Sequence, residues 1–544
     1  MSEPHQKTPL LEHANKKPPL SRPKAHRRRS SFEASTYNSA GRSMTYVKPF
    51  DPVPTTDPGL SFAKILALTV CMAGVQFTWT VELSYGTPYL LSLNLSKELT
   101  ALVWLAGPLS GLLVQPLIGA FSDKCTSRFG KRRPFMVVAG ALTCLSMIGV
   151  AYAREIGNTI AHLTVSDDDP DALRYAKHTN AILVAVASFY FLDFTLNAVQ
   201  AICRALILDI PPLWQQDYAN AWSARMSNCA MVIGYFVGFL DLVKYFPWLG
   251  DTQIKIFCIM AILVFVITIT ITCIVTKEKK LDREEKDNLP WYHTFVYIWR
   301  AFRFLPKPIQ TLCNTQFFAW MGWFPFLFYS TQWVSDIYFA SHPSNQADQG
   351  NWADGTRAGS FALLCYSIMS VVAGLVIPAI VIRFEKIKLF SLTNVYTASH
   401  LIVAASLLST YFIRSVTAAT FILTVMGIPW AIVLWIPFSL VGEFVSFEDE
   451  RRQIGHEASS SSAARLEDQQ EEFDAGMILG VHNMYIVFPQ FAVAIIAAFI
   501  FAATDAIKDD NDSSMSSVTP VLAFGGLMAL VAAGFSRYLI RVKQ

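Results

Sequence analysis

About twelve apolar segments of roughly 20 residues alternate with short charged stretches along this chain. A helix of about 20 residues crosses the hydrocarbon core of a bilayer, and lipid offers no partner to backbone groups outside helices or closed barrels. Only 16% of the residues are charged, against about 25% in soluble domains. These features predict an all-α polytopic membrane protein with helices near 62–91, 99–121, 134–153, 180–206, 219–245, 254–275, 309–333, 358–382, 388–412, 416–441, 475–503 and 518–540.

The basic residues lie in alternate intervals between these segments. Lys and Arg gather in cytoplasmic loops, so segment 276–308, both chain ends and the interval 121–135 are predicted to be cytoplasmic. Residues 1–60 are polar and are predicted to be a disordered tail. The intervals 154–179 and 503–517 are acidic and would face outside. The interval 121–135, "FSDKCTSRFGKRRPF", carries the basic residues Lys124, Arg128, Lys131, Arg132 and Arg133.

Two basic octapeptides indicate an internal duplication. "RFGKRRPF" at 128–135 and "RFEKIKLF" at 383–390 share Arg, Phe, Lys, a second base and Phe at the same offsets. They follow the second and the eighth apolar segment, which are equivalent places in two six-helix halves; chance similarity is the alternative. Transporters use such repeats to build a midplane site that opens to one side at a time. We therefore expect six-helix bundles at 61–275 and 309–544, joined by a loop at 276–308, with an acidic cytoplasmic loop at 443–474.

The fourth apolar segment carries a polar stripe. Its polar residues are four, three and four positions apart, which places them on one helix face: Asp193, Asn197, Gln200 and Arg204. Ionisable groups within a membrane are costly and mark functional sites, so Asp193 is predicted to load and release a proton. Amides donate and accept hydrogen bonds, which suits Asn197 and Gln200 to a hydroxyl-rich substrate that Arg204 would anchor. The alternatives are that Asp193 only joins helices and that Arg204 extends to the inner interface.

Other segments supply further candidates. Glu82 is a second acid within an apolar segment and a candidate for proton coupling, unless it lies near the outer interface. Arg225 and Glu443 are candidate charge partners for groups across the bundles. Amide and aromatic side chains can contact the hydroxyls and the apolar faces of a substrate, and the candidates of this kind are Gln76, Tyr85, Trp323 and Asn483.

Several kinds of function lack support in the sequence. It contains no nucleotide-binding loop, dinucleotide fingerprint, metal-ligand spacing or catalytic triad. Neither an ATP-driven pump nor an enzyme is therefore indicated, and no cofactor is expected beyond the proton gradient. The nine cysteines show no CxxC pair, and we expect free thiols. The expected partners are protons, a small substrate and the bilayer, with no nucleic acid, and we expect a monomer.

Five stretches carry a family resemblance: residues 73–135, "FLDFTLNAVQAICRALILD" at 191–209, "WFPFLFYSTQWV" at 323–334, "GIPWAIVLWIPFSL" at 427–440 and "LGVHNMYIVFPQ" at 479–490. They resemble the sucrose:proton symporters of plants and their fungal relatives, in the glycoside–pentoside–hexuronide:cation branch of the major facilitator superfamily. The resemblance implies twelve helices in two pseudo-symmetric bundles and alternating access. It also implies that Asp193 couples protons and contacts substrate and that Arg204 is functional. The loop resembles the superfamily's conformational motif, here Asp123, Arg128, Gly130, Lys131, Arg132 and Arg133.

The function that this resemblance implies is proton-coupled symport of α-glucosides, sucrose or maltose. Three departures bear on sugar recognition: Glu82 stands where plant members carry Gln, Lys97 stands about where they carry His, and Gln332 stands where they carry an acid. The alternatives are a monosaccharide:proton symporter of the same fold and a sugar sensor that does not transport. We expect the plasma membrane as its location, with a vacuolar or lysosomal membrane as the alternative.

Overall fold

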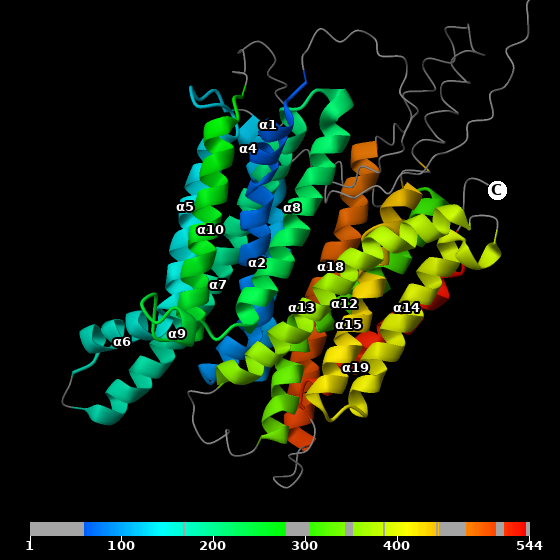
Figure 1. Cartoon of the computed structure of the whole chain (residues 1–544). Helices are drawn as coiled ribbons and strands as arrows, with labels where there is room; N and C mark the ends of the chain where they lie inside the picture. The colour runs from blue at the N-terminus through cyan, green and yellow to red at the C-terminus, as the bar shows by residue number, and fades with distance from the viewer. Residues whose placement is uncertain are drawn as a thin grey trace, which may run out of the picture.

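The computed structural model describes residues 59–123, 125–166, 169–278, 305–342, 352–384, 387–441, 444, 475–507 and 516–539. Within these residues all regular structure is helical, and the helices form two bundles that stand side by side (Figure 1). The predicted all-α fold is confirmed. Residues 1–58 and most of the segments 276–308 and 443–474 lie outside the described residues, so the predicted tail and loops stay predictions.

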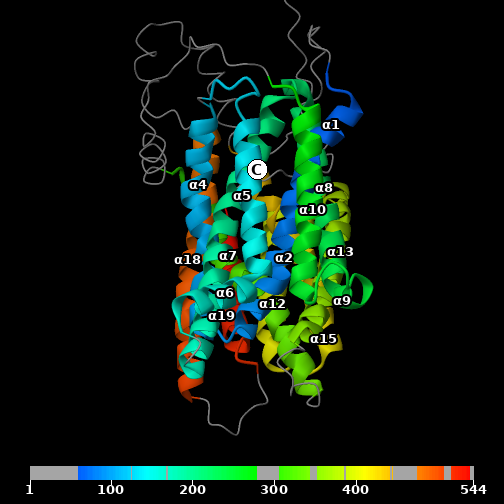
Figure 2. The ribbon, with the colours of Figure 1, turned by 90° about the vertical axis from the view of Figure 1, so that its left-hand side faces the viewer.

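The first bundle follows the predicted apolar segments. It contains α1 Phe62–Thr69, α2 Cys71–Ser92, α3 Lys97–Val103, α4 Ala106–Asp123, α5 Arg133–Ala151, α6 Ala153–Thr164, α7 Pro170–Asp209, α8 Leu213–Phe239, α9 Leu242–Tyr245 and α10 Gln253–Val275. The 40 residues of α7 span about 60 Å, about twice the thickness of a bilayer core. Its first turns therefore extend past the core, and they pair with α6 in a hairpin that leans away from the bundle (Figure 1 and Figure 2).

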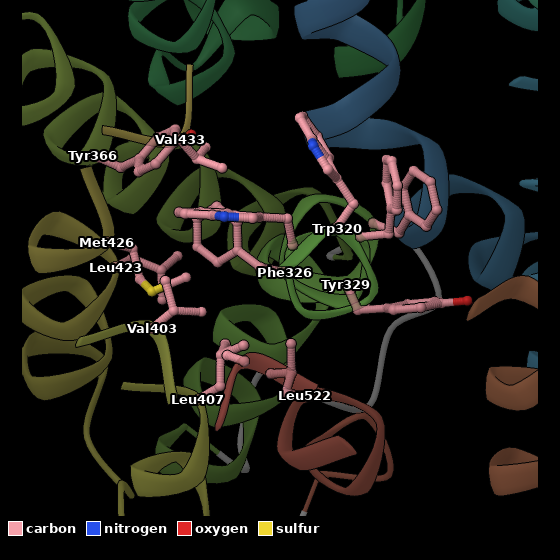
Figure 3. Packing of buried hydrophobic residues seen from close by; sticks show 14 of the residues in the cluster. Trp320, Phe326, Tyr329, Tyr366, Val403, Leu407, Leu423, Met426, Val433 and Leu522 are labelled. Carbon is pink, nitrogen blue, oxygen red and sulfur yellow. The ribbon is translucent and has the colours of Figure 1, made fainter. Parts of the chain in front are cut away.

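The second bundle is centred on α12. It contains α12 Lys307–Ser341, α13 Trp352–Arg383, η2 Lys388–Phe390, α14 Leu392–Leu408, η3 Ser409–Tyr411, α15 Val416–Val433, α18 Ala475–Ile507 and α19 Thr519–Ser536. Side chains of α12 such as Trp320, Phe326 and Tyr329 fill its core (Figure 3). A Cβ atom on Gly322 of α12 or Gly525 of α19 would lie 2.9 Å from the carbonyl oxygen of the other glycine. Only glycine permits this close approach of two backbones.

Ten segments of the described chain are long and apolar enough to cross a membrane. The sequence predicted twelve, and α8 and α12 occupy the two remaining positions. With 27 and 35 residues, both are long enough to span a bilayer, but they are less apolar. α8 packs against α2 and α13, and α12 packs against helices of both bundles. Protein rather than lipid covers much of their surface, which permits polar residues in these two helices.

The two bundles contact each other in the outer halves of their helices, as the predicted topology defines the outer side. Thr87 Oγ1 on α2 donates a hydrogen bond to the Phe328 carbonyl oxygen on α12 (2.7 Å), and Trp104 Nε1 donates one to Thr87 Oγ1 (3.1 Å). The rings of Trp104 and Phe328 stack with centroids 4.2 Å apart. Arg357 Nε on α13 donates to the Phe239 carbonyl oxygen on α8 (3.1 Å). These contacts close the molecule on its predicted outer side. The ribbons of the two bundles diverge toward the other end (Figure 1).

Candidate functional site

Two acids from different helices of the first bundle meet in its interior. Asp193 on α7 and Glu82 on α2 each expose 3% of their surface, and their carboxyl groups lie within hydrogen-bonding reach of each other. Two carboxylates offer only acceptors, so a hydrogen bond between them requires a proton on one. Two of their oxygens, Glu82 Oε2 and Asp193 Oδ1, are buried without a hydrogen-bond partner among the described residues. The pair can therefore share one proton.

The two acids of this pair face different surroundings. A methyl group placed on Gly107 of α4 would lie 3.7 Å from Asp193 Oδ1 and 3.8 Å from Gln490 Oε1 of α18, so Asp193 approaches the second bundle. Glu82 instead borders a small cavity inside the first bundle, between α2, α5, α7 and α10. The cavity is lined mainly by apolar side chains, including Val81, Met147, Val150, Phe189 and Leu192.

Asn197 connects α7 to α4. Its Nδ2 donates hydrogen bonds to Ser110 Oγ (2.7 Å) and to the Asp193 carbonyl oxygen (2.9 Å), and its Oδ1 accepts one from Gln115 Nε2 (2.9 Å). The amide is thus engaged on both its oxygen and its nitrogen. In this conformation Asn197 supports the helix that carries Asp193, and the predicted substrate contact stays a prediction.

The remaining stripe residues lie apart from the carboxyl pair. Gln200 and Arg204 are half-buried, and Arg204 Nε is buried without a hydrogen-bond partner among the described residues. Arg204 follows Asp193 by three turns of α7, or about 16 Å along the helix axis. Gln76 on α2 is half-buried as well. The structure therefore brings Asp193 together with Glu82 and Asn197, and it places Arg204 separately.

Three other predicted substrate contacts differ in exposure. Tyr85 is fully buried, and its hydroxyl group makes hydrogen bonds to α8 and α10 within the first bundle. Trp323 is 1% exposed and packs against the ring of Trp430 with centroids 5.0 Å apart, so neither face is open to a ligand in this conformation. Asn483 on α18 is exposed. Of the three, Asn483 has the surface that a substrate could reach.

The predicted charge partners and loop residues are placed as follows. Arg225 is exposed, and its guanidinium carbon lies 4.8 Å from the centroid of the Trp222 ring. Glu443 lies outside the described residues, so its role as a charge partner stays a prediction. Arg128 is exposed in the loop before α5, and the side chain of Asp123 lies outside the described part of the chain.

The second bundle contains a buried polar chain whose members were not predicted as site residues. Tyr396 Oη donates to Gln316 Oε1 (3.1 Å), and Gln316 Nε2 lies 3.3 Å from His482 Nε2, in a fully buried chain across α14, α12 and α18. Gln490, which approaches Asp193, was also missed. It follows Asn483 by seven residues, and seven residues are close to two helical turns. That spacing within an apolar segment was the signal that could have identified it.

The basic loop packs on two carboxylates that the sequence analysis did not single out. Asp209 at the end of α7 pairs with Lys131 Nζ (2.9 Å) and Arg132 Nε (3.0 Å). Glu278, just after α10, accepts hydrogen bonds from the backbone N–H groups of Arg132 (2.7 Å) and Arg133 (3.0 Å) at the start of α5. The loop therefore joins the ends of α5, α7 and α10 at the predicted cytoplasmic side.

Gly130 in this loop should not tolerate a side chain. Its φ is +106°, and a Cβ atom would lie 2.7 Å from the carboxyl carbon of Glu278. We expect Gly130→Ala to destabilise the protein by about 1–3 kcal/mol, measured as a lower melting temperature of the purified protein. Gly119→Ala is the matched control, since no described atom lies within 4 Å of its Cβ position. Equal melting temperatures for the two variants would contradict this account of the loop.

A membrane protein with two helical bundles and a buried pair of acids, one of which approaches the second bundle, has the architecture of a secondary transporter. The chain matches the family model of the Major Facilitator Superfamily over residues 66–455. It belongs to this superfamily and is an integral, multi-pass membrane protein of a transporter family, not an enzyme. The predicted superfamily is confirmed.

Individual relatives show which members of the superfamily the chain is similar to. The chain is 31% identical to the General alpha-glucoside permease of Schizosaccharomyces pombe, in an alignment that covers 90% of this chain and 96% of the permease. It is 27% identical to the Sucrose transport protein SUT5 of Oryza sativa subsp. indica, in an alignment that covers 87% of this chain and 88% of that protein. The predicted relation to fungal and plant proteins of this kind is confirmed.

Solved structures share the fold at low sequence identity. A bacterial homolog of the human lysosomal transporter Spinster superposes with a TM-score of 0.56 at 12% identity, covering 88% of this chain and 96% of that one. A D-xylose-proton symporter superposes with a TM-score of 0.51 at 13% identity, covering 88% of this chain and 98% of that one. These similarities establish the fold alone.

Proposed function

We propose that the protein is a proton-coupled symporter of α-glucosides such as sucrose or maltose. The observation that carries the proposal is the Glu82–Asp193 pair. Burying acids in a membrane protein is costly and marks ion or proton pathways, and a carrier of a neutral sugar needs no such pair unless a proton moves with the sugar. The similarity to an alpha-glucoside permease and to a sucrose transport protein supports the substrate class.

The two acids take different roles in this proposal. Asp193 approaches the second bundle and contacts the sugar, whereas Glu82 borders the cavity inside the first bundle and keeps the shared proton away from the sugar. A buried pair of adjacent carboxyl groups cannot carry two negative charges cheaply, so it retains one proton until water reaches it. Opening to the cytoplasm then releases the proton and the sugar together.

The contacts on the closed outer side take part in the other half of the proposed transport cycle. Trp104, Thr87 and Phe328 join the bundles there by stacking and hydrogen bonds. These contacts must separate before a sugar can enter from outside, and contacts at the inner ends must form in exchange. We infer that the described conformation corresponds to the state that releases substrate to the cytoplasm. We propose the plasma membrane as the location, where this cycle imports sugar.

Uptake in a yeast strain that lacks its own α-glucoside carriers tests the proposal. We expect cells that express the protein to accumulate labelled sucrose or maltose, faster at acidic than at neutral external pH, and to stop when an uncoupler is added. Uptake of glucose but of neither disaccharide would favour a monosaccharide symporter. A protein that reaches the cell surface and binds sugar without any flux would be a sensor. Fluorescence microscopy of a tagged chain would show whether vacuoles are the membrane to assay.

A further inference from the structure

The point where Asp193 meets the second bundle contains a residue with no assigned role. Asp193 Oδ1 and Gln490 Oε1 both lie within 4 Å of the position that a Cβ atom of residue 107 would occupy, and Gly107 leaves this position empty. Asp193 Oδ1 is buried and has no hydrogen-bond partner among the described residues. We propose that Gln490 is a sugar-positioning residue that binds the same substrate hydroxyl group as Asp193, in the space beside Gly107. This inference rests on the proposed sugar symport.

The chemistry of the two groups fits one hydroxyl. A sugar hydroxyl donates one hydrogen bond and accepts others. It donates to Asp193 Oδ1 and accepts from the Gln490 amide, which presents its NH₂ group after a rotation of its terminal bond. Asp193 belongs to the first bundle and Gln490 to the second. A hydroxyl bound to both residues thus joins the second bundle to Asp193, the acid that shares the proton with Glu82. Sugar binding therefore depends on the relative position of the two bundles.

The neighbouring positions on α4 and α18 agree with this assignment. Among the glycines of α4, Gly107 is the one whose Cβ position lies beside both polar atoms. Gly111, one turn further along α4, has no described atom within 4 Å of its Cβ position. On α18, Asn483 lies on the face of Gln490 and is exposed. Gln490 and Asn483 therefore share one face of α18, with the apolar Ile486 and Val487 between them.

Two substitutions of Gln490 separate this role from packing. Gln490→Leu keeps the size of the side chain but removes its hydrogen bonds, and we expect the KM for sugar to rise about tenfold or more, with a smaller change in maximal rate. Gln490→Glu adds an acid beside the carboxyl pair, which favours retention of the shared proton. We expect the external pH at which uptake falls by half to rise by about one unit. Of the described titratable groups, Glu82 from α2 and Tyr190 from α7 are those that interact with Asp193.

Glycine substitutions on α4 supply a matched pair. Gly107→Ala places a methyl group where the hydroxyl would lie, and we expect it to raise KM about as much as Gln490→Leu does. Gly111→Ala should leave KM unchanged. If Gln490→Leu does not reach the membrane, the KM for sugar is compared between the wild type and Gln490→Asn instead. This variant keeps the amide on a shorter side chain.

The outcomes distinguish this inference from the function on which it rests. Wild-type KM in the Gln490 variants together with a wild-type pH profile in Gln490→Glu would overturn the role of Gln490, while acid-stimulated uptake by the wild type would still support symport. A wild-type protein at the cell surface that carries no α-glucoside would overturn both.

Discussion

Asp193→Asn is expected to abolish concentrative uptake of sugar while preserving exchange of sugar across the membrane. Asparagine has nearly the same shape and still makes hydrogen bonds to hydroxyls, but it does not bind and release a proton. One proton that moves with each sugar down a potential of about 100 mV supplies about 2.3 kcal/mol, which sustains about a 50-fold sugar gradient. The variant should lose this gradient and only equilibrate the sugar.

Two measurements in the same cells check this expectation. The accumulation ratio of labelled sugar should fall, whereas exchange of labelled for unlabelled sugar should continue. Asp336→Asn is the matched control, because Asp336 lies on α12 in the second bundle, where it accepts hydrogen bonds from Gln332 Nε2 (2.6 Å) and Ser516 Oγ. Its substitution should leave accumulation intact. Full accumulation by Asp193→Asn would move proton coupling to Glu82 or to another group.

Glu278→Gln, which replaces one carboxylate oxygen by an NH₂ group, is expected to destabilise the protein strongly at its cytoplasmic side. The Glu278 side chain is only 2% exposed, lies 3.5 Å from Arg133 Nε, and accepts two backbone N–H bonds at the start of α5. A carboxylate is favoured at this end of a helix by the helix dipole. The glutamine amide has one acceptor oxygen and would turn its NH₂ group toward a donor. We expect a loss of about 2–4 kcal/mol and a lower melting temperature.

Asp251→Asn provides the comparison for Glu278→Gln. Asp251 also pairs with a cation, Lys255, at 2.7 Å, but its side chain is 73% exposed. The hydrogen bond from Lys255 lowers the pKa of Asp251, and solvent screens such a pair, so its loss should cost under about 1 kcal/mol. A Glu278→Gln protein that melts at the same temperature as Asp251→Asn would show that the buried carboxylate does not stabilise the loop.

Hydropathy and helical spacing predicted much of the fold without a structure. Membrane-spanning helices are local features, because each must satisfy its own backbone and present apolar side chains to lipid. The segments that become α8 and α12 were predicted too, although they are the most polar. The spacing of Asp193 and Asn197 likewise predicted one polar face on α7, and the structure places both residues at the junction with neighbouring helices.

What faces that polar stripe was decided only by the tertiary structure. Helical periodicity tells which residues share a face, but it contains no information on the helix packed opposite. The approach of Glu82 to Asp193, the use of Asn197 to join α7 to α4, and the position of Gln490 beside Gly107 all join residues far apart in the chain. The sequence by itself therefore determined the helices and the acid within them, whereas the partners of that acid depended on how the bundles pack.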